Sequence, residues 1–71
     1  MYYRRIRDLR EDSDLTQMQI AQAINVTQRS YSYYETGTHM IPPWVLSALA
    51  DFHHTSVDYL LGRTNVRAPY P

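Results

Sequence analysis

Apolar residues recur three or four positions apart along most of this chain, the spacing that places them on one face of an α-helix. In the first such segment, roughly Tyr3 to Glu11, Ile6 and Leu9 share one face and charged residues occupy the others. Four further segments with helical spacing follow, and no strand is predicted. The pattern therefore predicts an all-α protein.

Two short helices joined by a tight connection are predicted in the middle of the chain. Thr16 is followed three residues later by a glutamine, which is the capping-box pattern, and the helix that it opens ends near Ile24. Thr27 is the next candidate N-cap. It opens a helix through about Thr36, and Gly37 ends that helix from the C′ position.

The last two helices follow an irregular stretch. Pro43 suits the first turn of the fourth helix, where its missing N–H costs nothing. Ser56 can cap a short fifth helix that Gly62 ends. We therefore expect one domain over residues 1–62, with residues 63–71 as a flexible C-terminal tail.

Size and composition limit what this chain can be. Its 71 residues suffice for one domain, and the absence of cysteine means that helix packing alone must stabilise it. The apolar runs are too short to span a bilayer, and the charged start is unlike a secretory signal. We expect a cytoplasmic protein that needs no cofactor and has no membrane contact.

Charge distribution matters more than the net charge, which is zero. The seven basic residues are all arginine, and four of them lie within residues 1–10. Between Leu15 and Tyr34 the only charged residue is Arg29. A nucleic-acid surface in that segment would therefore be polar and aromatic, with few cations.

Two capped helices joined by a tight turn are what a helix-turn-helix needs, because the first braces the second across the major groove. Over residues 4–62 the chain resembles the lambda-repressor-like domains of the Cro and xenobiotic-response-element regulator type, and its last part is similar to small regulators of Gram-positive bacteria and their phages. The matching segments are Ile6-Arg7-Asp8-Leu9-Arg10, Leu15-Thr16-Gln17, Ile20-Ala21, Ile24-Asn25-Val26-Thr27, Tyr31-Ser32-Tyr33-Tyr34-Glu35-Thr36-Gly37, Leu49-Ala50-Asp51-Phe52 and Ser56-Val57-Asp58-Tyr59-Leu60-Leu61-Gly62.

The resemblance implies a compact five-helix domain whose recognition helix runs from Thr27 to Thr36. The residues on its groove-facing side would be Thr27, Gln28, Arg29, Ser32 and Tyr33. Their chemistry fits, because glutamine pairs through two hydrogen bonds with adenine and arginine does so with guanine. The alternative is a solvated helix face rich in glutamine and serine.

Further roles are implied for residues around this helix. Gln17 matches a family position that binds phosphate, although it could equally be an ordinary residue at a helix start. Thr27 and Ser30 would be other neutral donors to phosphates. Arg10 and Glu35 match a family ion pair that joins the first helix to the third, and Arg10 would also lie near a phosphate.

The loop after the recognition helix departs from the family pattern. It is often basic in the family, but here Thr38-His39-Met40-Ile41 contains no lysine or arginine. Arg4, Arg5 and Arg7 are then the main candidates for ionic contacts with DNA. We expect operator binding that depends less steeply on salt than is usual for the family.

The aromatic residues and histidines are interpreted mainly as parts of the hydrophobic core. Tyr31 and Tyr34 lie on the inward side of the third predicted helix. His53 falls where the family usually has an apolar residue and is expected to be packed and partly buried. The three histidines have no spacing typical of metal ligands, so no metal site is predicted.

Trp44 and its neighbour Val45 are expected at a dimer interface, because Trp44 stands where the family often has a polar residue and family dimers use this end of the domain. The alternative is that Trp44 packs onto its own domain. The function that this implies is a homodimeric, non-catalytic bacterial or phage regulator, most simply a repressor, that reads a near-palindromic operator in double-stranded DNA. The rival interpretation is a protein-interaction or antitoxin-like module, bound to a protein partner and binding DNA weakly.

Overall fold

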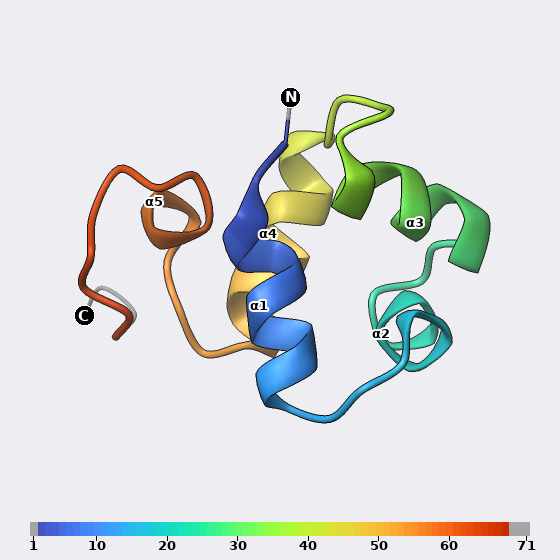
Figure 1. Ribbon diagram of the computed structural model, residues 1–71, viewed down its shortest axis with the longest axis horizontal. Helices are drawn as coiled ribbons and strands as arrows, with labels where there is room; N and C mark the ends of the chain where they lie inside the picture. Colours follow the sequence, from blue (N-terminus) through green and yellow to red (C-terminus); the bar gives the residue numbers. More distant parts are fainter. Residues whose placement is uncertain (1, 69–71) are drawn as a thin grey trace.

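The computed structural model describes residues 2–68 and contains five helices in that range (Figure 1). They are α1 (Arg4–Asp12), α2 (Gln17–Ala23), α3 (Gln28–Thr36), α4 (Pro43–Phe52) and α5 (Val57–Leu60). No strand occurs in the described range, so the all-α prediction is confirmed. None of these helices combines the length and hydrophobicity needed to cross a membrane.

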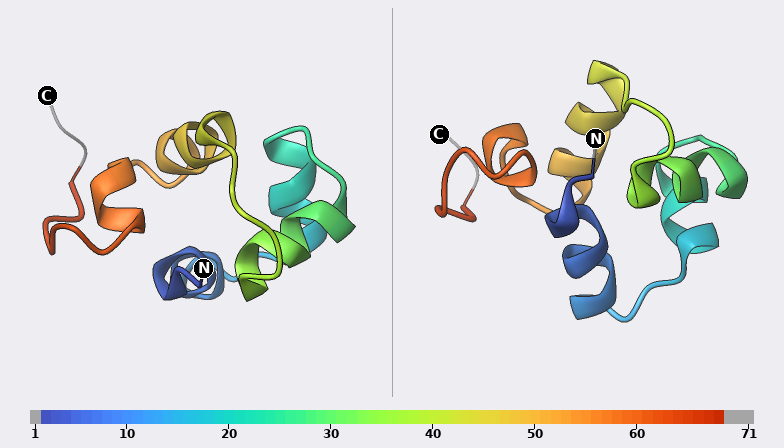
Figure 2. Two further views of the ribbon diagram at one scale, coloured as in Figure 1. Left: turned by 90° about the horizontal axis from the view of Figure 1, so that it is seen from above. Right: turned by 45° about the horizontal axis from the view of Figure 1, so that its top comes forward.

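The helices form a small bundle, and α1 contacts the helices at both of its ends. In Figure 1, α2 and α3 lie to one side of α1, α5 lies to the other, and α4 lies behind it. The strongest packing pairs α2 with α3 and α4 with α5, and α1 touches both α3 and α5. Both views of Figure 2 keep α2 and α3 at the opposite end from α5. The helix-turn-helix is therefore one end of the molecule.

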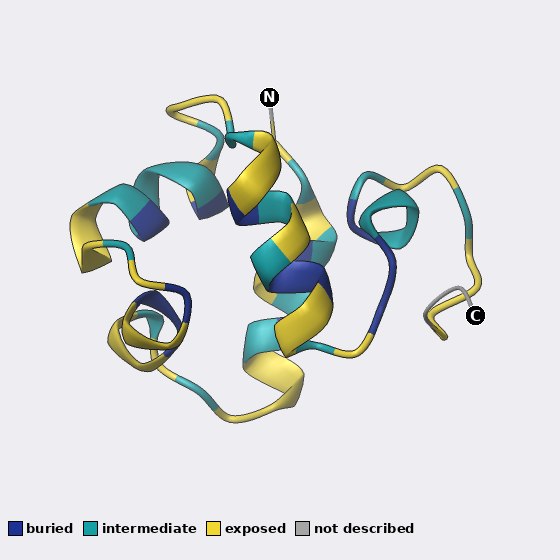
Figure 3. Ribbon diagram, turned by 180° about the vertical axis from the view of Figure 1, so that it is seen from behind, coloured by how far each residue is buried: buried dark blue, intermediate teal, exposed yellow. Residues whose placement is uncertain are grey.

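Every helix contributes to one hydrophobic core, and the buried segments in Figure 3 face this interior. The largest fully buried side chains are Ile6 and Leu9 from α1, Ile20 from α2, Tyr31 from α3, Val45 and Leu49 from α4, and Leu60 from α5. Tyr34 and Tyr59 are partly buried against this cluster, as expected for tyrosines that supply core volume.

The predicted helix ends are present. The Thr16 hydroxyl accepts a hydrogen bond from the Gln19 backbone N–H at 3.1 Å, and the Gln19 side chain accepts one from the Thr16 backbone N–H at 2.8 Å. These two bonds complete the capping box. After α3, Gly37 adopts φ 81°, the left-handed conformation that glycine adopts without strain.

The turn between α2 and α3 depends on Asn25, which has φ 60°. Asparagine is one of the few residues besides glycine that enter this region readily. The next residue, Val26, donates its N–H to the Ala21 carbonyl at 3.0 Å, which closes the turn against the end of α2. The short connection expected here is therefore a tight reversal of the chain.

The segment after α5 differs from the expected flexible tail. Arg5 on α1 donates to the carbonyls of Tyr59 and Thr64, at 3.0 and 2.5 Å. The Thr55 hydroxyl donates to the Arg67 carbonyl at 2.5 Å. These bonds hold residues 63–68, part of the expected tail, against the domain. Residues 69–71 of the expected tail lie outside the described residues.

His53 ends α4 as a partly buried side chain, which agrees with its interpretation as a packed histidine. Its ring meets Phe52 edge-on, with centroids 5.0 Å apart. Burial lowers the pKa of His53, and the positive charge of Arg67 lowers it further. The folded domain therefore favours the neutral imidazole.

Candidate nucleic-acid interface

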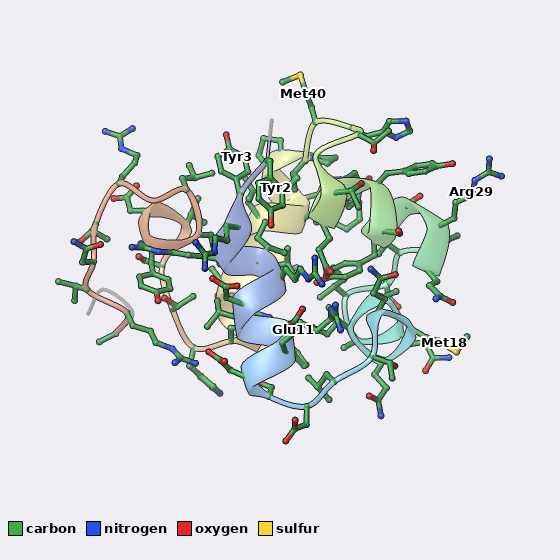
Figure 4. All side chains as sticks on the ribbon, in the orientation of Figure 1. Tyr2, Tyr3, Glu11, Met18, Arg29 and Met40 are labelled. Atoms are coloured by element: carbon green, nitrogen blue, oxygen red, sulfur yellow. The ribbon has the colours of Figure 1, made fainter. Side chains whose placement is uncertain are left out.

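Helix α3 divides cleanly into an inward and an outward face. Tyr31 and Glu35, one turn apart, are buried, whereas Gln28 and Arg29 are exposed and Tyr33 is partly exposed. In Figure 4 the Arg29 side chain projects away from the body of the domain. The structure thus places the predicted groove-facing residues on the outer side of the helix.

Arg29 does not extend freely into solvent. Its Nε donates to the Tyr33 hydroxyl at 2.9 Å, and its guanidinium carbon lies 5.6 Å from the centre of the Tyr33 ring. The two residues are one helical turn apart, the spacing at which side chains on a helix meet. Tyr33 therefore positions the single arginine of α3 before any ligand is bound.

A second aromatic contact continues the outer face beyond the helix. His39 lies against the same Tyr33 ring, with centroids 4.5 Å apart and planes tilted by 53°. The Thr38 N–H donates to the Tyr33 carbonyl at 2.9 Å, which brings the loop back over the last turn of α3. From the sequence alone, His39 has no predicted role in this surface. The available signal was Gly37, because a left-handed C′ residue directs the following chain back onto its helix.

The hydroxyl groups at the start of α3 are used within the protein. The Thr27 side-chain oxygen caps the helix by accepting the Ser30 backbone N–H at 3.1 Å. It also donates to the Ser30 hydroxyl oxygen at 3.0 Å. Thr27 and Ser32 complete the predicted set on this side, Thr27 exposed and Ser32 partly exposed.

The ion pair expected between α1 and α3 forms in the structure. Arg10 donates from Nε and Nη2 to the two carboxylate oxygens of Glu35, both at 2.8 Å. The side chains are 15% and 3% exposed, respectively. Arg10 Nη1 also donates to the Leu15 carbonyl at 2.9 Å. One guanidinium therefore joins α1, the loop before α2, and α3.

Glu35 remains ionised despite its burial. Burial by itself would raise the pKa of its carboxyl group, but hydrogen bonds from Arg10 and Gln17, together with the positive charge of Arg10, outweigh that effect and lower the pKa. The bond to Glu35 correspondingly raises the pKa of Arg10. Both side chains of the pair are therefore charged near neutral pH.

Gln17, the expected phosphate ligand, joins this buried pair. Its side-chain amide donates to Glu35 Oε1 at 3.3 Å, and the residue is partly buried at the start of α2. Gln17 and Glu35 also line a shallow hollow between α1, α2 and α3, together with Arg7, Arg10, Tyr2 and Thr36. A phosphate contact from Gln17 would have to replace its bond to Glu35.

The arginines of α1 are mostly engaged with their own helix or with the C-terminal segment. Arg4 pairs with Asp8 at 3.5 Å, and Arg7 pairs with Glu11 at 2.5 Å. Arg5 also lies 4.2 Å from the centre of the Tyr59 ring. Arg5, expected as a candidate for ionic contacts with DNA, instead holds the C-terminal segment.

The two residues expected at a dimer interface differ in burial. Trp44 is 56% exposed, so it does not pack fully onto its own domain. Val45 is 0% exposed and belongs to the core. The assignment of Val45 to a dimer interface is therefore wrong, because its side chain has no surface to offer. Met40, 87% exposed, precedes Trp44 in the same stretch and points away from the domain in Figure 4.

A family model described as a helix-turn-helix domain matches residues 4–66. The match spans nearly the whole chain, and the chain belongs to this family, as its motifs predicted. The match also extends past residue 62 into the segment that Arg5 holds.

The chain is also 40% identical over 65 residues to the uncharacterized HTH-type transcriptional regulator YobD of Bacillus subtilis (strain 168). The alignment covers 92% of this chain but only 58% of that relative. The chain therefore spans little more than half the length of YobD.

Proposed function

We propose that this chain is the sequence-specific DNA-binding domain of a transcription regulator and that α3 enters the major groove. The observation that carries the proposal is the outer face of α3, where Gln28 and a pre-positioned Arg29 stand exposed on a helix that α1 and α2 brace from behind. In helix-turn-helix proteins the N-terminal residues of the recognition helix contact base edges.

The chemistry of this face suits base reading. Gln28 has the donor and acceptor that pair with adenine N6 and N7, and Arg29 has the paired donors that match guanine O6 and N7. Tyr33 fixes Arg29 through its hydroxyl. A donor held in place loses less conformational entropy on binding, which favours discrimination between bases.

Phosphate contacts would come chiefly from neutral donors. We infer that Gln17 exchanges its bond to Glu35 for a phosphate oxygen, and that Thr27 and Ser30 bind the backbone beside it. Such contacts fix the register of the protein on the duplex without reading sequence. The name of YobD, a transcriptional regulator, supports a role of this chain in transcription, with repression by occlusion of a promoter as the simplest mode.

The proposal is tested by selecting duplexes from a random-sequence library at low salt. Enrichment of a common site, with two half-sites about one helical turn apart, is expected for a dimer that reads an operator. No enrichment over several rounds would contradict DNA reading. It would favour the second candidate, a protein-interaction or antitoxin-like module, which the zero net charge and the exposed Met40 and Trp44 support.

Operator affinity should depend only weakly on salt. The segment between Leu15 and Gly62 contains Arg29 as its single basic residue apart from histidine, and Arg10 is engaged with Glu35. With one to three ionic contacts per subunit, the slope of log K against log salt should be about −2 to −5 per dimer at neutral pH. A salt titration on the selected duplex measures it. A slope near −10, as in strongly basic repressors, would contradict the assignment of cations.

We further propose that the chain acts as a homodimer through the surface around Trp44. Two recognition helices must lie about 34–36 Å apart to read successive major grooves, and a two-fold interface provides that spacing. An exposed tryptophan is the type of residue that is enriched in interfaces.

Replacing Trp44 by glutamate should therefore yield monomers in sedimentation equilibrium, because a charge would be buried at the interface. Met18→Glu is the matched control, since Met18 has a similar exposure of 52% but lies on α2. This control should leave the association unchanged. A wild-type protein that sediments as a monomer at high concentration, and also when bound to DNA, would refute the dimer.

A further inference from the structure

We propose that His53 is a pH-dependent switch for the C-terminal segment 63–68, which stays bound to the domain above about pH 7 and is released as the pH falls toward about 5. The inference goes beyond the proposed DNA binding by α3 and does not depend on it. It concerns the opposite end of the molecule, where this segment lies beside α5 (Figure 1).

Few contacts hold the C-terminal segment. At its start, Arg5 donates to the Thr64 carbonyl at 2.5 Å and to Asn65 Oδ1 at 2.6 Å. At its far end, the buried Thr55 donates its hydroxyl to the Arg67 carbonyl at 2.5 Å. Most side chains of the segment are exposed. A segment with so little buried apolar surface can detach while the core remains folded.

His53 lies beside the second of these attachments. It precedes Thr55 by two residues, where α4 ends, and its side chain is partly buried. Among the described residues, no group forms a hydrogen bond with its Nε2 atom, which is itself buried. Both ring nitrogens of an imidazolium are donors. Protonation of the attached state would therefore leave a charged donor buried without an acceptor, which is costly.

The C-terminal segment also brings a positive charge to this ring. Burial lowers the pKa of His53, and the charge of Arg67 lowers it further. No carboxylate of residues 2–68 forms an ion pair with His53. The other ionisable groups of α4, α5 and their connecting turn are exposed or in contact with an arginine: Asp51, His54, Asp58 and Tyr59. A positive charge on His53 is therefore disfavoured while the segment is bound.

The sign of the pH dependence follows from these contacts. When the segment detaches, Arg67 moves away and water reaches the turn, so the pKa of His53 rises toward its ordinary value of 6.5. The detached state thus takes up a proton more readily than the attached state. By linkage, the attachment has its full strength above about pH 7 and weakens as the pH falls toward the lowered pKa.

The test places a spin label on the segment. The chain contains no cysteine, so Val66→Cys provides a single labelling site, on a side chain that is 59% exposed. Electron paramagnetic resonance then distinguishes an immobilised label from a mobile one. Between about pH 7.5 and about pH 5, we expect the ratio of mobile to immobilised label to rise at least about fivefold. Circular dichroism at each pH verifies that the helices remain folded.

Two variants in this labelled background separate the switch from the attachment. His53→Leu replaces the ring by an apolar side chain that cannot be protonated, so the label should stay immobilised at both pH values. Thr55→Val removes the donor to the Arg67 carbonyl, so the label should be mobile at both. Because the linkage is reciprocal, Thr55→Val should also raise the pKa of His53 in an NMR titration of its ring protons.

His54→Asn is the matched control. His54 is the adjacent, exposed histidine, and asparagine tolerates its φ of 53°. This variant should keep the full pH response. The inference would be overturned by an unchanged response in His53→Leu, by a wild-type label whose mobility is independent of pH, or by a His53 pKa that Thr55→Val leaves unchanged. No DNA is present in these measurements, so such results would leave the proposed function intact.

Discussion

Replacing Arg10 by alanine is expected to lower the unfolding free energy by about 3–5 kcal/mol. The substitution leaves the Glu35 carboxylate, 3% exposed, without its two charged hydrogen bonds, and it removes the donor to the Leu15 carbonyl. A domain of this size has a total stability of about 4–10 kcal/mol. The variant should therefore be close to unfolding at room temperature, as measured by urea titration with circular dichroism.

Arg7→Ala is the control on the same helix. Arg7 forms a comparable contact with Glu11, but both side chains are more than half exposed. Exposed ion pairs one helical turn apart contribute little to stability. The unfolding free energy of this variant should therefore be close to that of the wild type. Equal losses from the two substitutions would show that burial does not determine the importance of the Arg10–Glu35 pair.

A double-mutant cycle with Arg10→Ala and Glu35→Ala isolates the interaction itself. The combined loss should be clearly smaller than the sum of the single losses, and strict additivity would mean that the side chains do not interact. Exchanging the two residues should recover only part of the stability. A glutamate at position 10 cannot donate to the Leu15 carbonyl, which Arg10 does at 2.9 Å.

The second large effect is expected on DNA recognition. Gln28→Ala and Arg29→Ala should each weaken binding to the selected duplex by about 1–3 kcal/mol, which is about fivefold to more than a hundredfold. Each should also relax the preference at particular base positions. Both side chains are exposed, so urea titrations should remain close to those of the wild type.

Arg63→Ala is the control for a general loss of positive charge. Its side chain is 75% exposed and belongs to the segment at the opposite end from α3 (Figure 1). It should leave both affinity and base preference unchanged. If Gln28→Ala and Arg29→Ala bind the selected duplex as tightly as the parent does, the assignment of α3 as the reading helix is wrong.

The helices and their ends were predictable because their signals are local. Thr16 with Gln19, and Thr27 with the N–H of Ser30, are three residues apart, so the capping bonds follow from the chain itself. The Arg10–Glu35 pair spans 25 positions. No spacing rule connects two residues so far apart, and the pair was expected only through the family resemblance.

Trp44 and Val45 show where the sequence interpretation failed. The two are adjacent, and grouping them at one interface overlooked the rotation of about 100° between neighbouring residues of a helix. Val45 lies one turn before Leu49, and both are buried, so helical periodicity places the two side chains on the same inward face of α4. The burial of Val45 was therefore predictable from the local sequence pattern.

Other features could not be predicted because they depend on the assembled fold. Arg5 bonds to residues that follow it by 54 to 60 positions, and nothing near Arg5 in the sequence indicates this. The orientation of Gln17 likewise depends on where packing places Glu35. The contacts of these side chains are determined only once the helices have packed together.

The anchoring of residues 63–68 by Arg5 and Thr55 affects how the domain can be joined to another molecule. A fluorescent protein or a second domain fused directly after residue 68 would be attached on the side away from α3. The six positions that follow Gly62 would have reached about 20 Å as an extended, unattached chain. Bound to the domain, they provide none of that reach. A fused partner would therefore stand at a set point beside α1 and α5 and leave the outer face of α3 unobstructed.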